Sequence, residues 1–161
     1  MRTKTERFFA VVLVVGGVVG IAIAIVFGMQ LFKQNWLLGC SMLLLLVLFA
    51  WVAFVGLRLW QGTPYGRRWA IILFATQIPV LAIPGFRYQW FTGAEFAPTL
   101  SSGSGSMTLG VHFNMGANGD FFFGGTVPQM ILGINLFAIL AVAMLVRSKR
   151  SIKKHDSLPA S

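Results

Sequence analysis

Long uninterrupted apolar runs divide the chain, and they carry the first prediction about its fold. Residues 8–32 and 37–57 are almost wholly apolar, and shorter apolar runs follow at 69–84 and 127–146. At about 1.5 Å per residue, a helix over 8–32 reaches roughly 37 Å, which exceeds a hydrocarbon core of about 30 Å. The pattern predicts four transmembrane helices that form one all-α membrane bundle, a single domain over residues 1–161.

Residues 86–126 differ from the rest because apolar and polar positions alternate there. A period of two is typical of a β-strand with one apolar face. The apolar positions of this alternation are Met107, Leu109, Val111, Phe113 and Met115. Residues 116–119 have the composition of a turn, and residues 120–123 are suited to a returning strand. After a Gly/Ser-rich link at 98–106, we expect a small antiparallel β element of two or three strands between the third and fourth helices.

The alternating apolar residues have two interpretations. We favour packing of this face on the outer end of the bundle, because a lone two-stranded hairpin is marginally stable in water. The alternative is a binding surface for a partner protein or for lipid, to which Trp90 from the preceding aromatic cluster would also belong. On the polar side, Glu95 and Asp120 are candidates for exposed ion pairs with Arg87 or His112, which contribute little stability.

Small and polar residues inside the apolar runs indicate how the helices pack. A stripe of small residues recurs every four positions in the first run, at Gly16, Gly20, Ala24 and Gly28. Such a stripe lets another helix approach closely, either from the same chain, which we favour, or from a second copy. Gln77 and Asn135 occur at similar depths in the third and fourth runs, so we expect an amide hydrogen bond between them. The alternative role for this pair is a polar site for a solute.

Charge adds an orientation to the predicted bundle. The 161-residue chain is 57% hydrophobic and 11% charged, with a formal net charge of +9. Eleven of its thirteen basic residues fall at the N-terminus, at 58–68 and in the tail at 147–161, leaving Lys33 and Arg87 on the other side. Because Lys and Arg concentrate in cytoplasmic segments, we expect both termini in the cytoplasm, residues 86–126 outside, and a bacterial inner membrane as the location. A signal peptide cleaved near Ala24 is less favoured, since apolar residues continue to Phe32.

Residues that carry chemistry are sparse. The single cysteine, Cys40, has no partner for an intrachain disulfide, and the few His, Asp and Glu residues offer little for a metal site. Phosphate-binding, zinc-protease and nucleophile-elbow motifs are missing, and the apolar runs contain no charged residue. A basic face suited to nucleic acid is missing as well. The sequence therefore favours a protein without catalytic activity, cofactor or metal.

The predicted function is binding within a membrane. Besides the lipid bilayer, we expect the partner to be another membrane or envelope protein, or a second copy of the chain. The protein would be a subunit, an assembly factor or a protective, immunity-like partner that presents the outer β element. The alternative is an oligomeric channel or small-solute carrier, built on the level of Gln77 and Asn135 and on the glycine stripe.

Overall fold

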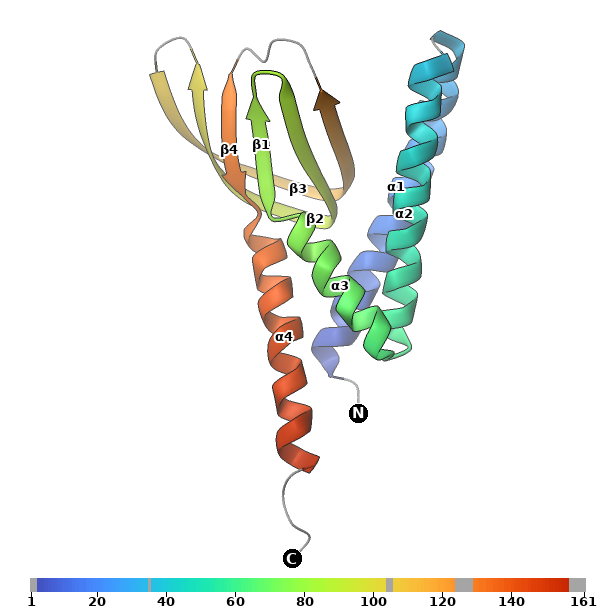
Figure 1. Cartoon of the computed structure of the whole chain (residues 1–161), viewed down its shortest axis with the longest axis vertical. Coiled ribbons are helices and arrows are strands. Elements are labelled where there is room, and N and C mark those ends of the chain that lie inside the picture. The colour runs from blue at the N-terminus through green and yellow to red at the C-terminus, as the bar shows by residue number, and fades with distance from the viewer. Residues whose placement is uncertain (1–2, 35, 104–105, 124–128, 157–161) are drawn as a thin grey trace, which may run out of the picture.

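The structure is a computed structural model, and it describes residues 3–34, 36–103, 106–123 and 129–156. Helix α1 (Lys4–Gln34) and helix α2 (Trp36–Trp60) run side by side, while the shorter α3 (Pro64–Thr76) and α4 (Leu136–Asp156) stand below a sheet (Figure 1). The strands of the sheet are β1 (Pro79–Ile83), β2 (Phe86–Gly103), β3 (Ser106–Phe123) and β4 (Met130–Ile134).

The prediction of an all-α bundle of four transmembrane helices is wrong. The described part of the chain has four helices, but a four-stranded antiparallel sheet accompanies them. In that part, only α1 and α2 contain stretches that are long and apolar enough to cross a membrane. The third expected helix, 69–84, is helical only to Thr76 and continues as β1. Of the fourth, 127–146, the described portion begins with β4 and turns helical at Leu136.

Proline and long-range strand pairing explain why these two apolar runs change conformation midway. Pro79 has no N–H group for a helical hydrogen bond, and it disfavours the helical conformation of the residue before it. Helix α3 closes just ahead of this proline, where Gln77 N donates to Phe74 O at 3.1 Å and Ile78 N donates to Ala75 O at 3.3 Å. The freed backbone of β1 then pairs with β4, from Pro79↔Ile134 onward.

Strands β2 and β3 form one long antiparallel ribbon that is sharply kinked near its middle. Their register extends from Phe86↔Phe123 to Gly103↔Ser106. At the kink, Gly93 and Gly116 are direct cross-strand partners, with φ of 92° and 126°. Residues with a side chain rarely adopt such φ values, so this kink in the ribbon requires glycine in both strands.

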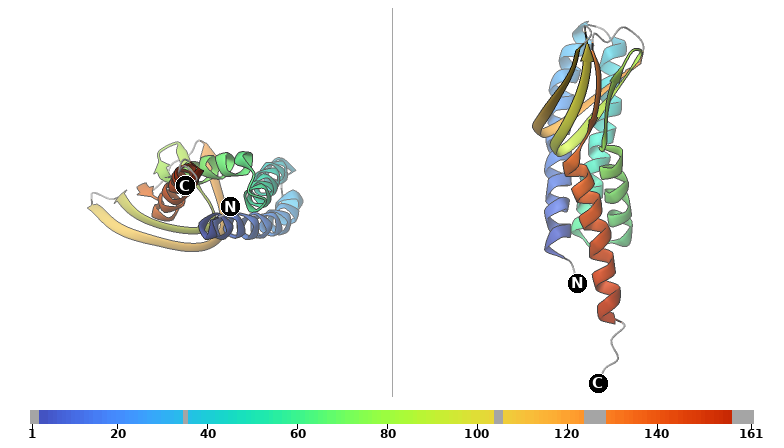
Figure 2. Two further views of the ribbon diagram at one scale, coloured as in Figure 1. Left: turned by 90° about the horizontal axis from the view of Figure 1, so that it is seen from below. Right: turned by 90° about the vertical axis from the view of Figure 1, so that its left-hand side faces the viewer.

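The kink divides the ribbon into two arms on either side of the β1–β4 pair. The first arm contains residues 86–92 of β2 and 117–123 of β3, and the second arm contains residues 94–103 of β2 and 106–115 of β3. The first half of β2 pairs with β1, the second half pairs with β4, and β1 pairs with β4. Both arms rise from the kink, and the first arm, which contains the C-terminal half of β3, stands next to α1 and α2 (Figure 1). Seen from below, the ribbon curves past α4 to reach α1 (Figure 2).

This topology also corrects the expected strand pairing. The alternating residues 107–115 lie within β3, but residues 116–119 are not a turn, because β3 continues through them to Phe123. Residues 107–115 pair with 94–102 of β2, and the chain reverses between Gly103 and Ser106, inside the expected Gly/Ser-rich link. In the described part of the chain the element has four strands, not two or three. A glycine with positive φ occurs both in turns and at a kink within a strand, so composition does not separate the two.

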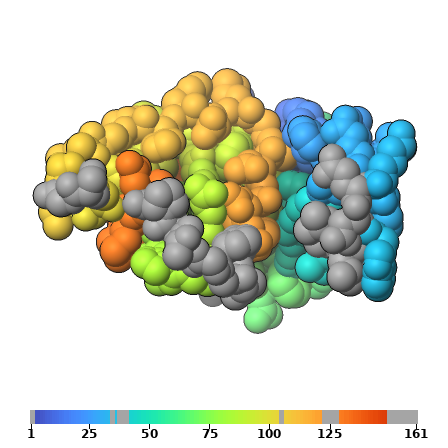
Figure 3. All heavy atoms as spheres, turned by 90° about the horizontal axis from the view of Figure 1, so that it is seen from above, coloured from blue at the N-terminus to red at the C-terminus, as the bar shows by residue number. Residues whose placement is uncertain are grey.

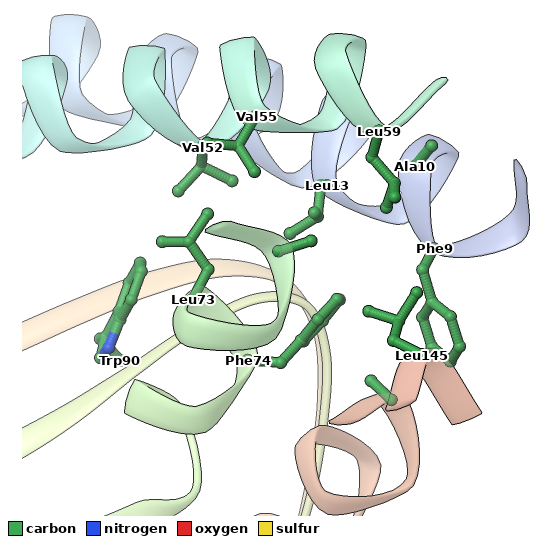
Figure 4. Packing of buried hydrophobic residues seen from close by; sticks show 12 residues of the cluster. Phe9, Ala10, Leu13, Val52, Val55, Leu59, Leu73, Phe74, Trp90 and Leu145 are labelled. Carbon is green, nitrogen blue, oxygen red and sulfur yellow. The ribbon is translucent and has the colours of Figure 1, made fainter. Parts of the chain in front are cut away.

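The hydrophobic core lies between the helices and the base of the sheet (Figure 4). Phe9 of α1, Phe74 of α3 and Phe137 of α4 pack edge to face, with ring centroids 5.5 to 6.3 Å apart. At the basic end of the molecule, Glu6 lies 3.4 Å from an Arg67 nitrogen and accepts a hydrogen bond from Ser148 at 3.1 Å. These contacts hold the first turns of α1 and α3 against α4 at Ser148.

Candidate functional site

Buried polar side chains gather where the helices meet the sheet. Gln77, at the end of α3, is 1% exposed. Its Nε2 donates to Thr92 Oγ1 at 3.0 Å, and its Oε1 accepts from Thr92 N at 3.1 Å. In place of the expected bond to Asn135, Gln77 therefore connects α3 to the kinked ribbon. The amide oxygen accepts from a buried backbone donor of β2 next to its kink.

Asn135 joins three parts of the fold at the boundary between β4 and α4. Its backbone N donates to Ile78 O at 2.8 Å. Its Oδ1 accepts from Phe137 N at 3.1 Å and from Ala138 N at 3.4 Å, as the capping residue of a helix does. The same oxygen accepts from Phe96 N of β2 at 3.3 Å. One side chain thus starts α4 and fixes the second arm of the ribbon above it.

Replacing Asn135 tests this double role. Asn135→Ala is expected to lower the free energy of unfolding by about 1–2 kcal/mol, since it removes the cap and leaves Phe96 N without its acceptor. Asn135→Ser is the matched control, because its shorter side chain still supplies a capping oxygen but does not extend to Phe96. Chemical unfolding in detergent micelles measures both variants. Equal losses in the two variants would contradict a contribution from the cap.

Glu95 is a buried acidic side chain in the second arm, 1% exposed, on the face of the sheet opposite the alternating apolar residues of β3. Both carboxylate oxygens accept from Gln89 Nε2 at 3.2 Å, and Oε2 also accepts from Asn114 Nδ2 at 3.1 Å. Gln89 precedes the kink at Gly93 and Glu95 follows it, so this cluster clamps the two arms together. The described residues contain no group of three His, Cys, Asp or Glu side chains that could hold a metal ion.

The alternating apolar residues of β3 do not pack on the helices, so the favoured interpretation of that face is wrong. Their exposed fractions lie between 64% and 86%: Met107, Leu109, Val111, Phe113 and Met115. They belong to the second arm of the ribbon, which the kink at Gly93 and Gly116 directs away from α1 and α2 (Figure 1). Trp90 is not part of this surface, because it is 4% exposed in the core and its indole donates to Thr76 O at 3.2 Å.

The small residues of α1 face neighbours within the chain. A Cβ atom on Gly16 would lie 2.6 Å from the backbone N of Gly93, and one on Gly20 would lie 2.3 Å from the Phe49 ring. Gly28 faces Met42 at 3.3 Å, and Ala24 is 4% exposed. The stripe therefore accommodates both α2 and the base of the sheet.

The sequence did not indicate the clamp formed by Gln89, Glu95 and Asn114. Glu95 was expected in an exposed ion pair, and this prediction is wrong. The other expected pair, Asp120 with Arg87, is confirmed, with 3.0 Å between the charged atoms. The available signal was the polar side of the alternation, where Asn114 stands directly opposite Glu95 in the register. No protein-family model matches the chain, and neither a curated protein nor a solved structure does. The exposed arm and the buried polar junction are the features from which a function has to follow.

Proposed function

We propose that the protein is an integral membrane protein without catalytic activity that binds another membrane or envelope protein along β3. In this proposal α1 and α2 cross a bacterial inner membrane, and both termini lie in the cytoplasm. The grouping of basic residues supports this orientation, because the start of α1 and the α2–α3 connection lie at one end of the molecule (Figure 1). Arg7 belongs to the start of α1, and Arg58 and Arg67 flank the connection.

The free edge of β3 between Ser106 and Met115 is the observation that supports binding. Among the described strands, β3 pairs with β2 alone, and this half of β3 is exposed on both faces. Seen from above, it lies at the end of the molecule opposite α1 and α2 (Figure 3). The other half of β3 is near the helices, where a Cβ atom on Gly119 would lie 3.0 Å from Leu45.

An edge of this composition is suited to strand addition. Proteins that keep a sheet edge unpaired usually protect it with Lys, with Pro or with a bulge, whereas residues 106–115 contain no Lys, Arg or Pro. An added strand gains affinity from main-chain hydrogen bonds, and the alternating side chains give specificity. Apolar side chains of the partner's strand would continue the apolar face of β3, to which Leu109 and Val111 belong.

Photo-crosslinking in native membranes tests the proposal. A photoreactive phenylalanine analogue at Leu109 is expected to give a covalent adduct with a second protein, because the edge places this side chain beside the added strand. The same analogue at Leu44 of α2, which is 74% exposed, is the control and is expected to give lipid adducts only. Lipid adducts alone at both positions would refute a protein partner. Adducts with a second copy would identify the partner as the chain itself.

The alternative function is an oligomeric channel or small-solute carrier. It depends on a polar site formed by Gln77 and Asn135 at one depth in the membrane, and on the stripe of small residues in α1. Gln77 is engaged with Thr92, the Asn135 oxygen with three backbone N–H groups, and Gly16 with the ribbon. These groups have intramolecular roles. Asn135 Nδ2 is buried without a hydrogen-bond partner, but one such atom does not make a continuous polar path for a solute.

A further inference from the structure

We infer that the sheet lies inside the membrane, with its outer face against lipid acyl chains. It would occupy the half of the bilayer away from the end of the molecule that carries Arg7, Arg58 and Arg67. This inference rests on the membrane placement proposed above and adds what surrounds the sheet. It differs from an external β element, because the strands themselves would complete two of the chain's passages through the bilayer.

Two segments that combine a helix with a strand match the thickness of a bilayer. From Arg67 to Thr76, α3 has ten residues and β1 adds five, which reach roughly 15 Å and 17 Å, about 32 Å together. From Leu136 to Val146, α4 has eleven residues and β4 adds five, about 33 Å together. The hydrocarbon core measures about 30 Å. No charged residue lies between Trp69 and Ile83 or between Met130 and Val146.

The height of the sheet along α1 supports the same placement. Gly16, near the middle of the 31-residue α1, packs directly on the kink of the ribbon, since a Cβ atom there would lie 2.6 Å from Gly93 N. From this level both arms rise in the direction of the C-terminal half of α1, one arm next to α1 and α2 and the other on the far side of the β1–β4 pair (Figure 1). That half of the helix, residues 17–32, is apolar apart from Gln30. If α1 crosses a membrane, the arms share its depth in the bilayer.

On β2 and β4 the two faces of the sheet have the polarity that a lipid environment requires, whereas residues 106–115 of β3 are exposed on both faces. Cross-strand partners share a face, and Leu100 is paired with both Leu109 and Leu132. Side chains on this outer face are apolar and 38% to 50% exposed on the inner strands: Phe96, Leu100, Leu132 and Ile134. On the opposite face Glu95 and Thr99 are buried. Strands in a membrane alternate in this way, with apolar side chains toward lipid and polar ones inward.

Backbone pairing is also compatible with a lipid environment over most of the sheet. In hydrocarbon each unpaired N–H or C=O group costs several kcal/mol. β1 pairs with β2 and β4, and β4 pairs with β1 and β2, so both short strands have neighbours on two sides. The described edge that faces away from the helices is residues 106–115 of β3, which the proposed partner strand would cover.

Site-directed spin labelling tests the placement. Single cysteines at Ile134, Leu132 and Met130, in a Cys40→Ser background, place labels at successive positions on the outer face of β4. The chain is reconstituted in phosphatidylcholine–phosphatidylglycerol vesicles, and collision rates with oxygen and with a water-soluble nickel chelate are compared. We expect oxygen to dominate at all three positions. The oxygen-to-nickel ratio is expected to fall severalfold from Ile134 to Met130, because each step of two residues moves the label about 7 Å toward the interface.

A label at Val47 of α2, which is 63% exposed, separates the inference from the membrane proposal beneath it. Nickel access at all β4 positions, with oxygen dominant at Val47, would place the sheet in water and overturn the inference while the helices remain in the membrane. Nickel access at Val47 as well would overturn both. Low collision rates with both reagents along β4 would show that protein covers this face, which also overturns the inference.

Discussion

Gly93→Ala is expected to lower the free energy of unfolding by about 2–6 kcal/mol, the largest loss that we expect from one added methyl group. A side chain at a φ of 92° costs about 1–3 kcal/mol in backbone strain. The new Cβ atom would also lie 2.2 Å from Cγ1 of Val12, so α1 and the ribbon would have to separate at this contact. Overpacking of this kind costs about 1–3 kcal/mol more. Unfolding in detergent micelles, followed by tryptophan fluorescence, measures the loss.

Gly116→Ala is the matched control for this prediction. Gly116 is the cross-strand partner of Gly93 and has a φ of 126°, but a Cβ atom there would meet nothing within 4 Å. It should therefore show only the strain, about 1–3 kcal/mol. Adding Val12→Ala to Gly93→Ala is expected to recover part of the loss by removing the clash. A Gly116→Ala loss as large as that of Gly93→Ala would contradict close packing of α1 as the added cause.

Gln77→Leu is expected to lower the free energy of unfolding by about 2–4 kcal/mol. The substitution keeps the size of the side chain but makes it apolar, and it leaves the N–H and the hydroxyl of Thr92 buried without their partner. Each buried group that loses its hydrogen bond costs about 1–3 kcal/mol. Thr92 is 0% exposed, so water does not replace the lost bonds in the folded protein. The same unfolding measurement detects the loss.

A double-mutant cycle with Thr92→Val identifies the source of that loss. Thr92→Val removes one of the two hydrogen bonds and keeps the bond from Thr92 N to Gln77 Oε1, so about 1 kcal/mol is expected. Because the two side chains are in contact, the double variant should lose less than the two single losses together. Strict additivity would contradict a direct energetic coupling between α3 and the ribbon at this point.

Hydropathy alone established that α1 and α2 are long and apolar enough to cross a membrane, since both properties are local to the chain. It also marked 69–84 and 127–146 as uncharged stretches. The conformation of those stretches did not follow, because hydropathy is the same for an apolar helix and an apolar strand of the same composition. Proline within a helix can kink it or end it, and the local sequence around Pro79 does not decide between the two. Pro79 ends the helix, because β4, more than fifty residues away in the chain, provides a paired alternative for the freed backbone.

The site shows the same division between local and long-range information. Alternation by itself determined that Met107, Val111 and Met115 share one face of a strand, because strand geometry alternates side chains at every residue. Whether that face is covered depended on the direction of the second arm, which the paired glycines at 93 and 116 and the contact with Gly16 decide. The partners of Gln77 and Asn135 likewise depended on tertiary structure, since Thr92 and Phe96 reach them only once the ribbon has folded. The sequence determined span-length helices and a two-faced strand; long-range pairing decided where the helices stop and which face stays open.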